Sequence, residues 1–312
     1  MKIYNDLTQC IGNTPLIKVD NFSNYCKIGD LQNNIYVKAE FFNPSGSVKD
    51  RAAYNIISKA IDKGLIKENT TVIASTSGNM GISIAMICSL LNKKCIITMP
   101  SNFSKERILM MKAYNAEVVL TNAKKLMTGS VEKALELHKL IKDSYYIDQF
   151  AEENNYLAHY KTTGKEIYDD LDGKVDVVIS TIGSGGTITG VAKYLKEKNP
   201  DIKIIGVEPS ESPLITKGYC NAHNIQGIGA SFIPKILDLN VIDEVLTASY
   251  EEAKSFCKVI MRDGLFVGIS SGACLAATVL AIYKNKFKDK NIVVILPDNG
   301  SKYLSTMKKT GE

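Results

Sequence analysis

The stretch NPSGSVKDRAA, residues 43–53, places a lysine where a helix begins. From Val48 onward apolar residues recur at three- and four-residue spacing, which predicts a helix with Ser45 or Ser47 as its cap. Lys49 then falls in the first turn, where the partial positive charge of the helix end disfavours a cation by about 0.3–1 kcal/mol. The same potential disfavours the ammonium form, so the stretch predicts a nucleophilic amine. A lysine that is merely exposed is the alternative.

On both sides of this helix, short runs rich in β-branched residues alternate with longer helical patterns. Such alternation predicts parallel sheets covered by helices on both faces, with ligands bound at the carboxyl ends of the strands. The loop-rich segment 210–238 is predicted to be a lid or a wall of the site. The predicted strands are 35–40, 71–76, 95–100, 117–121, 145–148, 175–181, 203–209 and 291–297.

Composition describes an ordinary globular chain of 312 residues, 45% hydrophobic and 23% charged. The 38 Lys and Arg residues are interspersed with 33 Asp and Glu residues, so the net charge of +5 gives little support to a nucleic-acid partner. The N-terminal MKIYNDLTQC lacks the apolar run of a signal peptide, and no stretch of about 18 apolar residues suggests a membrane span. We therefore expect a cytoplasmic protein without membrane contact.

The cysteines and histidines suggest neither a disulfide framework nor a metal site. Seven cysteines occur without a C-x-x-C pair or regular spacing, and those in apolar helical runs are expected to be small core residues. His138, His159 and His223 have no motif around them, so we expect each to be structural or exposed and predict no bound metal.

Two glycine-containing loops stand at predicted strand-to-helix junctions. In ASTSGNMGIS, residues 74–83, hydroxyl side chains and glycine precede a helix and favour binding of a carboxylate or a phosphate. In GSGGTITG, residues 183–190, the glycines at 183, 185 and 186 let the backbone approach an anion, which is typical of a phosphate cradle. A capped helix with a tight turn is the simpler interpretation of the first loop.

A nicotinamide dinucleotide site is a rival interpretation of the second loop. Glu208 lies at the end of the next predicted strand, where such a fold places the acid that binds ribose. However, Ile188 occupies the third glycine position, and this interpretation leaves Lys49 without a role. A phosphate cradle, an anion-binding loop and an isolated lysine on one α/β scaffold instead indicate pyridoxal phosphate, whose aldehyde needs a lysine amine.

The chain resembles the cysteine synthase (O-acetylserine sulfhydrylase) and cystathionine β-synthase family of fold type II pyridoxal phosphate enzymes. The resemblance runs from IGNTPL at Ile11 to LPDNGSKYLST, with the motifs in the family's order. It implies a tryptophan synthase β-like α/β fold of two lobes, each a mainly parallel twisted sheet flanked by helices. Residues 1–40 and 153–312 would form the larger, cofactor-binding lobe, and residues 41–152 the smaller, mobile lobe. The intervening motifs are NPSGSVKDR, TSGNxG, GSGGTITG, GVEP, GIGA and GISSGA.

Motif by motif, the resemblance assigns roles to individual residues. Lys49 matches the Schiff-base lysine, the catalytic residue, and Asn79 the asparagine that bonds the cofactor's ring hydroxyl. Ser270 resembles the serine facing the pyridine nitrogen, with Ser271 the second choice. The phosphate loop comprises Gly183, Ser184, Gly185, Gly186 and Thr187, and the substrate carboxylate is assigned to Thr76, Ser77, Asn79 and Gln149.

The implied reaction is β-replacement on a β-substituted L-alanine such as O-acetylserine, serine or cysteine, through an aminoacrylate to which a thiol or sulfide adds. Relatives suggest a homodimer. Two positions depart from the family pattern: Met80 replaces the usual threonine and Ser231 the usual glycine. They indicate either neutral drift or a changed substrate, for example cysteine with release of hydrogen sulfide and formation of lanthionine, cystathionine or serine. A non-catalytic binding protein on this scaffold is a further alternative.

Overall fold

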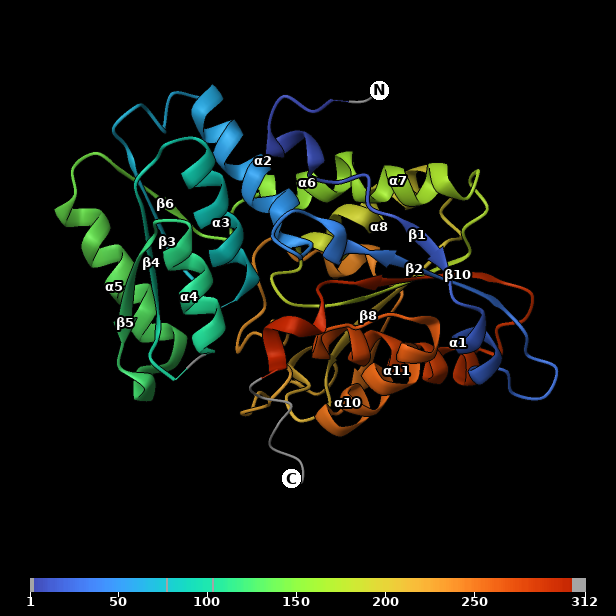
Figure 1. Ribbon diagram of the computed structural model, residues 1–312. Coiled ribbons are helices and arrows are strands. Elements are labelled where there is room, and N and C mark those ends of the chain that lie inside the picture. Colours follow the sequence, from blue (N-terminus) through green and yellow to red (C-terminus); the bar gives the residue numbers. More distant parts are fainter. Residues whose placement is uncertain (1–2, 77, 103, 305–312) are drawn as a thin grey trace.

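The computed structural model describes residues 3–76, 78–102 and 104–304, and its strands form two separate sheets (Figure 1). The larger sheet has the order β1-β2-β10-β7-β8-β9 and the smaller one β5-β4-β3-β6. The chain therefore leaves the larger sheet after β2 and returns to it at β7. The strands are β1 (Leu16–Lys18), β2 (Asn34–Ala39), β3 (Thr71–Ser75), β4 (Cys95–Pro100), β5 (Glu117–Thr121), β6 (Ser144–Ile147), β7 (Val177–Thr181), β8 (Lys203–Pro209), β9 (Glu244–Ala248) and β10 (Asn291–Leu296).

Every strand pair between β2 and β10 in the described chain is parallel, and only β1 pairs antiparallel, with β2. Parallel sheets are covered on both faces, which is why their central strands are apolar along their whole length. All residues of β3, β4 and β7 are buried. This arrangement confirms the predicted α/β class and brings strand ends of one sheet to a common edge.

Helices cover both sheets. The smaller sheet, at the left of Figure 1, carries α3, α4 and α5, whereas α10 and α11 lie under the larger one. Helix α2 packs on α3 and on α6, and α6 packs on α8, so α2 and α6 connect the two parts. The α-helices are α1 (Asp20–Tyr25), α2 (Lys49–Asp62), α3 (Asn79–Leu90), α4 (Lys105–Ala113), α5 (Leu126–Leu140), α6 (Asn154–Lys161), α7 (Thr163–Asp170), α8 (Gly186–Lys198), α9 (Leu214–Lys217), α10 (Tyr250–Val259) and α11 (Ile269–Asn285). Short 3-10 helices are η1 (Leu7–Cys10), η2 (Glu40–Phe42), η3 (Ala123–Lys125), η4 (Leu239–Val241), η5 (Ile260–Asp263) and η6 (Gly300–Tyr303).

The eight predicted strands all occur, with ends within two residues of the predicted ones. Two further strands, β1 and β9, were not predicted from the sequence. Both lie at the edges of the larger sheet. β1 has only three residues and no buried one, and β9 buries only two of its five. Such strands lack the continuous apolar run that identifies a buried strand.

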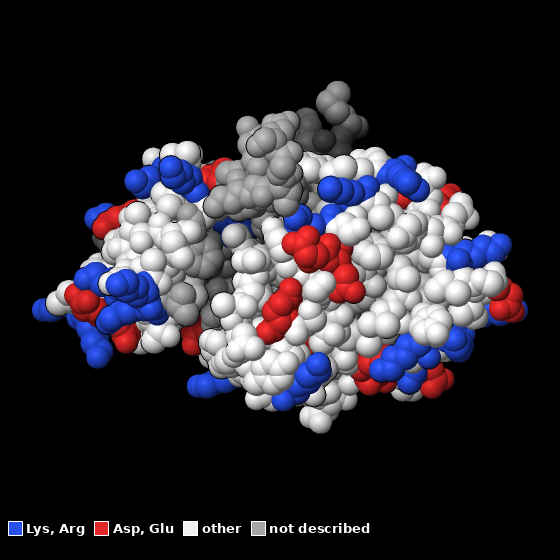
Figure 2. Space-filling model, turned by 90° about the horizontal axis from the view of Figure 1, so that it is seen from below, with Lys and Arg blue, Asp and Glu red and all other residues white. Residues whose placement is uncertain are grey.

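Each sheet has its own hydrophobic core. In the smaller one, α2 and α3 bury residues such as Ile56 and Ile84 against β3 and β4, and in the larger one α11 buries residues such as Leu275. Charged side chains of both signs are interspersed over the face shown in Figure 2. No helix within residues 3–76, 78–102 and 104–304 is long and apolar enough to cross a membrane.

Candidate active site

Lys49 is the first residue of α2, as the sequence predicted. The predicted serine cap is wrong in detail, because the N-cap is Val48 and has no side-chain bond to the helix. Ser47 Oγ instead accepts the backbone N–H of Lys49 at 3.3 Å. Ser45 donates its backbone N–H to the carboxylate of Asp50 at 2.7 Å. Asp50 thus supplies the acid that a helix N-terminus favours, beside the lysine that it disfavours.

The amine of Lys49 is poised to lose its proton. Desolvation lowers its pKa from 10.5 to about 8, and the nearby carboxylate of Asp298 acts in the opposite direction. From the sequence we predicted a lowered pKa for Lys49 and gave the helix dipole as its cause, but the main cause in the structure is burial. A pKa of about 8 leaves an appreciable fraction of the amine neutral near pH 7, which nucleophilic or base chemistry requires.

A buried ion network anchors α2 at Arg51, two residues after Lys49. The guanidinium of Arg51 donates to both oxygens of Glu40 at 2.8 Å and to both oxygens of Glu166 at 2.6 and 2.7 Å. The ammonium of Lys38 lies 2.9 Å from Glu166. Burial alone would raise the pKa of Glu166, but the hydrogen bonds and charges of Arg51 and Lys38 lower it to about 2. The network joins β2, α2 and α7 and fixes where Lys49 lies.

The predicted phosphate loop connects β7 to α8, and neighbouring chain encloses its glycines. Gly185 has φ +85°, in the left-handed region that favours glycine. A Cβ on Gly183 would lie 2.4 Å from the carbonyl oxygen of Gly227, and one on Gly186 would lie 2.0 Å from Asn155 Oδ1. Because the first N–H groups of a helix have no partner within it, this loop presents donors to an anion.

Asn155, in α6, connects this loop to the end of β6. Its Nδ2 donates to Ser184 Oγ at 3.2 Å and to the backbone oxygen of Gln149 at 2.7 Å. Asn155 is 2% exposed, so these bonds lie in the interior. The structure therefore brings Gln149, predicted to bind substrate, beside the phosphate loop, predicted to bind cofactor.

His159 lies behind the same loop, also in α6. Its Nε2 is 3.3 Å from Thr187 Oγ1 and its Nδ1 is 2.9 Å from Thr163 Oγ1. Burial, then the positive charges of Arg51 and Lys49, lower the pKa of His159 well below its ordinary value. The imidazole is thus neutral, and any anion in the loop is held mainly by N–H dipoles.

The predicted carboxylate-binding loop joins β3 to α3. Thr76 is buried, and its Oγ1 accepts the N–H of Gly78 at 3.3 Å. Asn79 is the first residue of α3, and its Nδ2 donates to Asp298 at 2.7 Å. Ser77 lies outside the described residues. Asp298 follows β10 in the other sheet, so the two sheets meet at Asn79.

Ser270 and Ser271 begin α11, near the end of β10. Ser271 Oγ donates to the backbone oxygen of Asp298 at 3.3 Å, while the Ser270 hydroxyl bonds to no protein group in the described part of the chain. Both serines are buried. The free hydroxyl therefore belongs to Ser270, the residue that the resemblance pairs with the pyridine nitrogen. The backbone N–H of Gly268 also donates to Asp298 at 3.0 Å, which holds α11 against the strand end.

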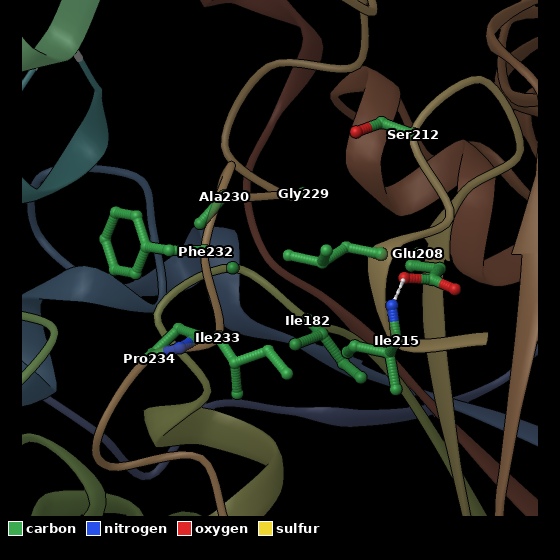
Figure 3. A pocket seen from close by; sticks show the side chains of 11 residues that line it. Ile182, Glu208, Ser212, Ile215, Gly229, Ala230, Phe232, Ile233 and Pro234 are labelled. Atoms are coloured by element: carbon green, nitrogen blue, oxygen red, sulfur yellow. Dashed lines mark hydrogen bonds between the residues drawn. The ribbon is translucent and has the colours of Figure 1, made fainter. Parts of the chain in front are cut away.

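Glu208 has a structural role that opposes the dinucleotide interpretation. Its carboxylate accepts the N–H groups of Ile215 and Thr216, both at 2.9 Å, and so caps α9. Figure 3 shows it at one end of a small cavity beside Gly183, bonded to the Ile215 nitrogen. Ile182 and Ile233 make other walls of this cavity apolar. Glu208 is only 2% exposed, so no carboxylate is left for a ribose hydroxyl.

The two departures from the family pattern lie in different surroundings. Met80 is 2% exposed and packs in the core of the smaller sheet. Its side chain therefore contributes to packing, which favours drift over a direct change in substrate. Ser231 is exposed, in the loop that borders the cavity of Figure 3. Next to it, Phe232 makes an edge contact with Phe150, the residue after Gln149, with ring centroids 4.9 Å apart.

The sequence analysis assigned no part in the site to Asn155, Asp298 and Lys302, and it expected His159 to be structural or exposed; His159 is buried and supports the phosphate loop from behind. Asp298 could have been recognised as a candidate site residue from the sequence, because it directly follows an apolar strand at the edge where ligands bind. Lys302 follows in the next turn and donates to Asn79 Oδ1 at 3.0 Å.

The donor set fits pyridoxal phosphate. A buried amine of lowered pKa could bond the aldehyde, an enclosed glycine loop at a helix N-terminus could hold the phosphate, and a free serine hydroxyl could meet the pyridine nitrogen. Asp298 bonds to Asn79 and to Ser271, so it joins the loop after β3 to the start of α11, and Asn155 bonds to Ser184, so it holds the phosphate loop against α6.

Comparisons with known proteins also indicate a pyridoxal-phosphate-dependent enzyme. The family described as pyridoxal-phosphate dependent enzyme matches residues 7–298. Cysteine synthase B of Campylobacter jejuni is 45% identical over 307 residues, which cover 98% of this chain and 99% of the relative. Among solved structures, a cysteine synthase from Entamoeba histolytica has a TM-score of 0.94 at 38% identity, covering 100% of this chain and 92% of its own. A hydrogen sulfide-producing enzyme from Fusobacterium nucleatum has a TM-score of 0.92 at 43% identity, covering 97% and 100%. The chain therefore belongs to the cysteine synthase family of pyridoxal-phosphate-dependent enzymes.

Proposed function

We propose that this protein catalyses β-replacement on a β-substituted L-alanine, in the manner of a cysteine synthase. The observation that carries the proposal is the buried amine of Lys49 at the start of α2, whose pKa is lowered by desolvation to about 8 against the opposing charge of Asp298. When bound, pyridoxal phosphate supplies an electron sink that makes the Cα proton of an amino acid acidic.

Lys49 acts as the base in this proposal. Once the substrate is bound and the side chain of Lys49 is free, its neutral amine accepts the Cα proton of the substrate and can later return it. Asp298 stabilises the ammonium that forms, because its carboxylate raises the pKa of the lysine. The anchored start of α2 keeps the amine in place during both steps, since Arg51 is bonded to two carboxylates.

The phosphate loop and Ser270 hold the cofactor. The residues that bind phosphate are Gly183, Ser184, Gly185, Gly186 and Thr187. A neutral hydroxyl at the pyridine nitrogen, from Ser270, withdraws less electron density than a charged acid would, which suits loss of a β-substituent.

The substrate carboxylate is assigned to the loop after β3 and to the segment after β6, through Thr76, Ser77, Asn79 and Gln149. Thr76, Asn79 and Gln149 belong to the smaller sheet's side of the site, whereas the phosphate loop belongs to the larger one. Substrate binding would therefore bring the two sides together.

We extend the proposal to the organisation of the chain. Residues 1–40 and 153–312 form the larger lobe and residues 41–152 the smaller one, which closes over the substrate and excludes water. Membership of β3–β6 in one sheet and of the other strands in the second supports this division. We further propose that the protein works in the cytoplasm as a homodimer.

Product analysis tests the reaction. The purified protein is given O-acetylserine with sulfide, and cysteine alone or with homocysteine, and the products are identified by mass. We expect cysteine from the first mixture. No turnover of O-acetylserine, together with rapid sulfide release from cysteine, would contradict the cysteine synthase assignment.

A second candidate is a cysteine-consuming enzyme that releases hydrogen sulfide and makes lanthionine, cystathionine or serine. The similarity to the Fusobacterium nucleatum enzyme, at 43% identity over almost the whole chain, favours it. The exposed Ser231 loop, close to the segment after β6, is where a difference in substrate would arise. Changing Ser231→Gly in the same assay tests this, because an unchanged ratio of the two activities would exclude a role for the loop residue.

A further inference from the structure

The side-chain amide of Asn79 is held at both ends by charged groups from one distant segment. Its Nδ2 donates to Asp298 Oδ2 at 2.7 Å, and its Oδ1 accepts from the ammonium of Lys302 at 3.0 Å. Both partners lie after β10, more than 200 residues along the chain from Asn79. Among the described residues, none that lies between Asn79 and these two partners in sequence takes part in this clamp.

The chemistry of these two partners permits only one orientation of the amide. An ionised carboxylate only accepts hydrogen bonds, and an ammonium only donates them. If the Asn79 amide turned over, its oxygen would face Asp298 and its NH2 group would face Lys302, so both bonds would be lost. Charged partners make the two bonds stronger than neutral ones would. The clamp therefore selects one of two otherwise similar rotamers.

Asp298 and Lys302 are themselves fixed. Asp298 is fully buried, and its Oδ2 also accepts the hydroxyl of Tyr303 at 2.8 Å. Lys302 is 4% exposed, and its ammonium donates to the backbone oxygen of Gly46 at 3.2 Å. Desolvation lowers the pKa of Lys302, while the carboxylates of Asp298 and Asp50 raise it. The ammonium of Lys302 therefore bonds to protein groups and has little contact with solvent.

We propose that Asp298 and Lys302 are positioning residues that lock the Asn79 amide with its nitrogen toward the cofactor site. One N–H of Asn79 is used by Asp298, and the second makes no bond in the described part of the chain. That second N–H is the donor for the ring hydroxyl of pyridoxal phosphate. This inference rests on the proposed function, which assigns Asn79 to the cofactor.

A double-mutant cycle on cofactor affinity tests the proposal. Lys302→Met and Asn79→Ala are made singly and together, and the dissociation constant of pyridoxal phosphate is measured by equilibrium dialysis of the apoprotein. We expect Lys302→Met to weaken binding by more than about threefold, because the amide is then held at one end only; loss of the whole hydrogen bond to the cofactor, about tenfold, is the upper limit. In the Asn79→Ala background the same change should add less than about threefold, since residues that act through one another are not additive.

Two controls separate positioning from general damage. Lys302→Arg keeps a donor-only cation and should remain within about threefold of the parent protein. Lys290→Met removes a lysine directly before β10 that is half exposed and paired with Asp176, and it should leave affinity unchanged. If Lys302→Met does not fold, Lys302→Gln takes its place in the cycle. Urea unfolding of each apoprotein verifies that the variants are folded.

A direct readout of the amide needs no activity. In apoprotein labelled with 15N-asparagine, the Asn79 NH2 proton that bonds Asp298 should lie downfield of the range of solvent-exposed asparagine amides, and this downfield shift should diminish in Lys302→Met. Additive losses of affinity in the cycle, or an Asn79 NH2 proton with the ordinary shift of an exposed asparagine in the parent protein, would overturn the positioning role. If Asn79→Ala leaves affinity unchanged, the assignment of Asn79 to the cofactor fails instead.

Discussion

Replacing Glu166 by glutamine should destabilise the protein strongly at neutral pH and weakly in acid. Glu166 lies in the ion network behind Lys49, with a side chain 14% exposed. It accepts two bonds from Arg51 and one from Lys38, and these lower its pKa from 4.5 to about 2 against the effect of burial. A change from 4.5 to about 2 corresponds to about 3 kcal/mol, at about 1.4 kcal/mol for each tenfold change in the protonation equilibrium.

The pH dependence follows from the direction of this shift. A carboxyl group whose pKa is lower in the folded state stabilises that state above the unfolded pKa, and the contribution disappears as the pH falls through the folded value. The difference in unfolding free energy between the parent protein and Glu166→Gln should thus be about 3 kcal/mol at pH 7 and roughly half of that near pH 3.

Urea unfolding followed by circular dichroism at both pH values measures the difference. The matched control is Glu136→Gln, an exposed partner of Lys133 on α5, which should change stability by less than about 0.5 kcal/mol. A loss below about 1 kcal/mol for Glu166→Gln at pH 7, or a loss that does not shrink in acid, would refute the reasoning.

Three further predictions concern the site. Gly186→Ala should abolish tight cofactor binding, measured by dialysis, because the added Cβ would lie 2.0 Å from Asn155 Oδ1; retained affinity would contradict the cradle. Met80→Thr should lower the unfolding free energy by about 2–3 kcal/mol, since it leaves a hydroxyl and a void in the core, while donor preference stays the same. The rate at which the apoprotein bonds pyridoxal phosphate should rise with pH through about 8, the pKa of Lys49, because only the neutral amine attacks. A midpoint near the ordinary 10.5 would show that the amine is not desolvated.

The strand pattern and the start of α2 could be predicted because they depend on local sequence. Buried parallel strands read as continuous apolar runs, and the helix after residue 48 shows regular apolar spacing. Lys49 was conspicuous for a similar reason, as a cation in a first helical turn. The motifs of the family resemblance then assigned Ser270 and the phosphate loop without any knowledge of their contacts.

The supporting groups could not be predicted in this way, because they act through contacts between distant parts of the chain. His159 meets the phosphate loop across two packed helices, and Asp298 reaches Asn79 across the two sheets. Local sequence carries no signal for such contacts. The cause of the lysine's lowered pKa was missed for the same reason, since burial depends on the whole fold and the helix dipole only on one element.

The central claim is that the side-chain nitrogen of Lys49 forms the covalent bond to pyridoxal phosphate. Borohydride reduction of the cofactor-loaded protein, followed by peptide mapping by mass spectrometry, tests it directly. We expect one pyridoxyl label, on the peptide that contains Lys49, and none in Lys49→Ala. A label on Lys302 or on any other lysine, or no label in the parent protein, would contradict it.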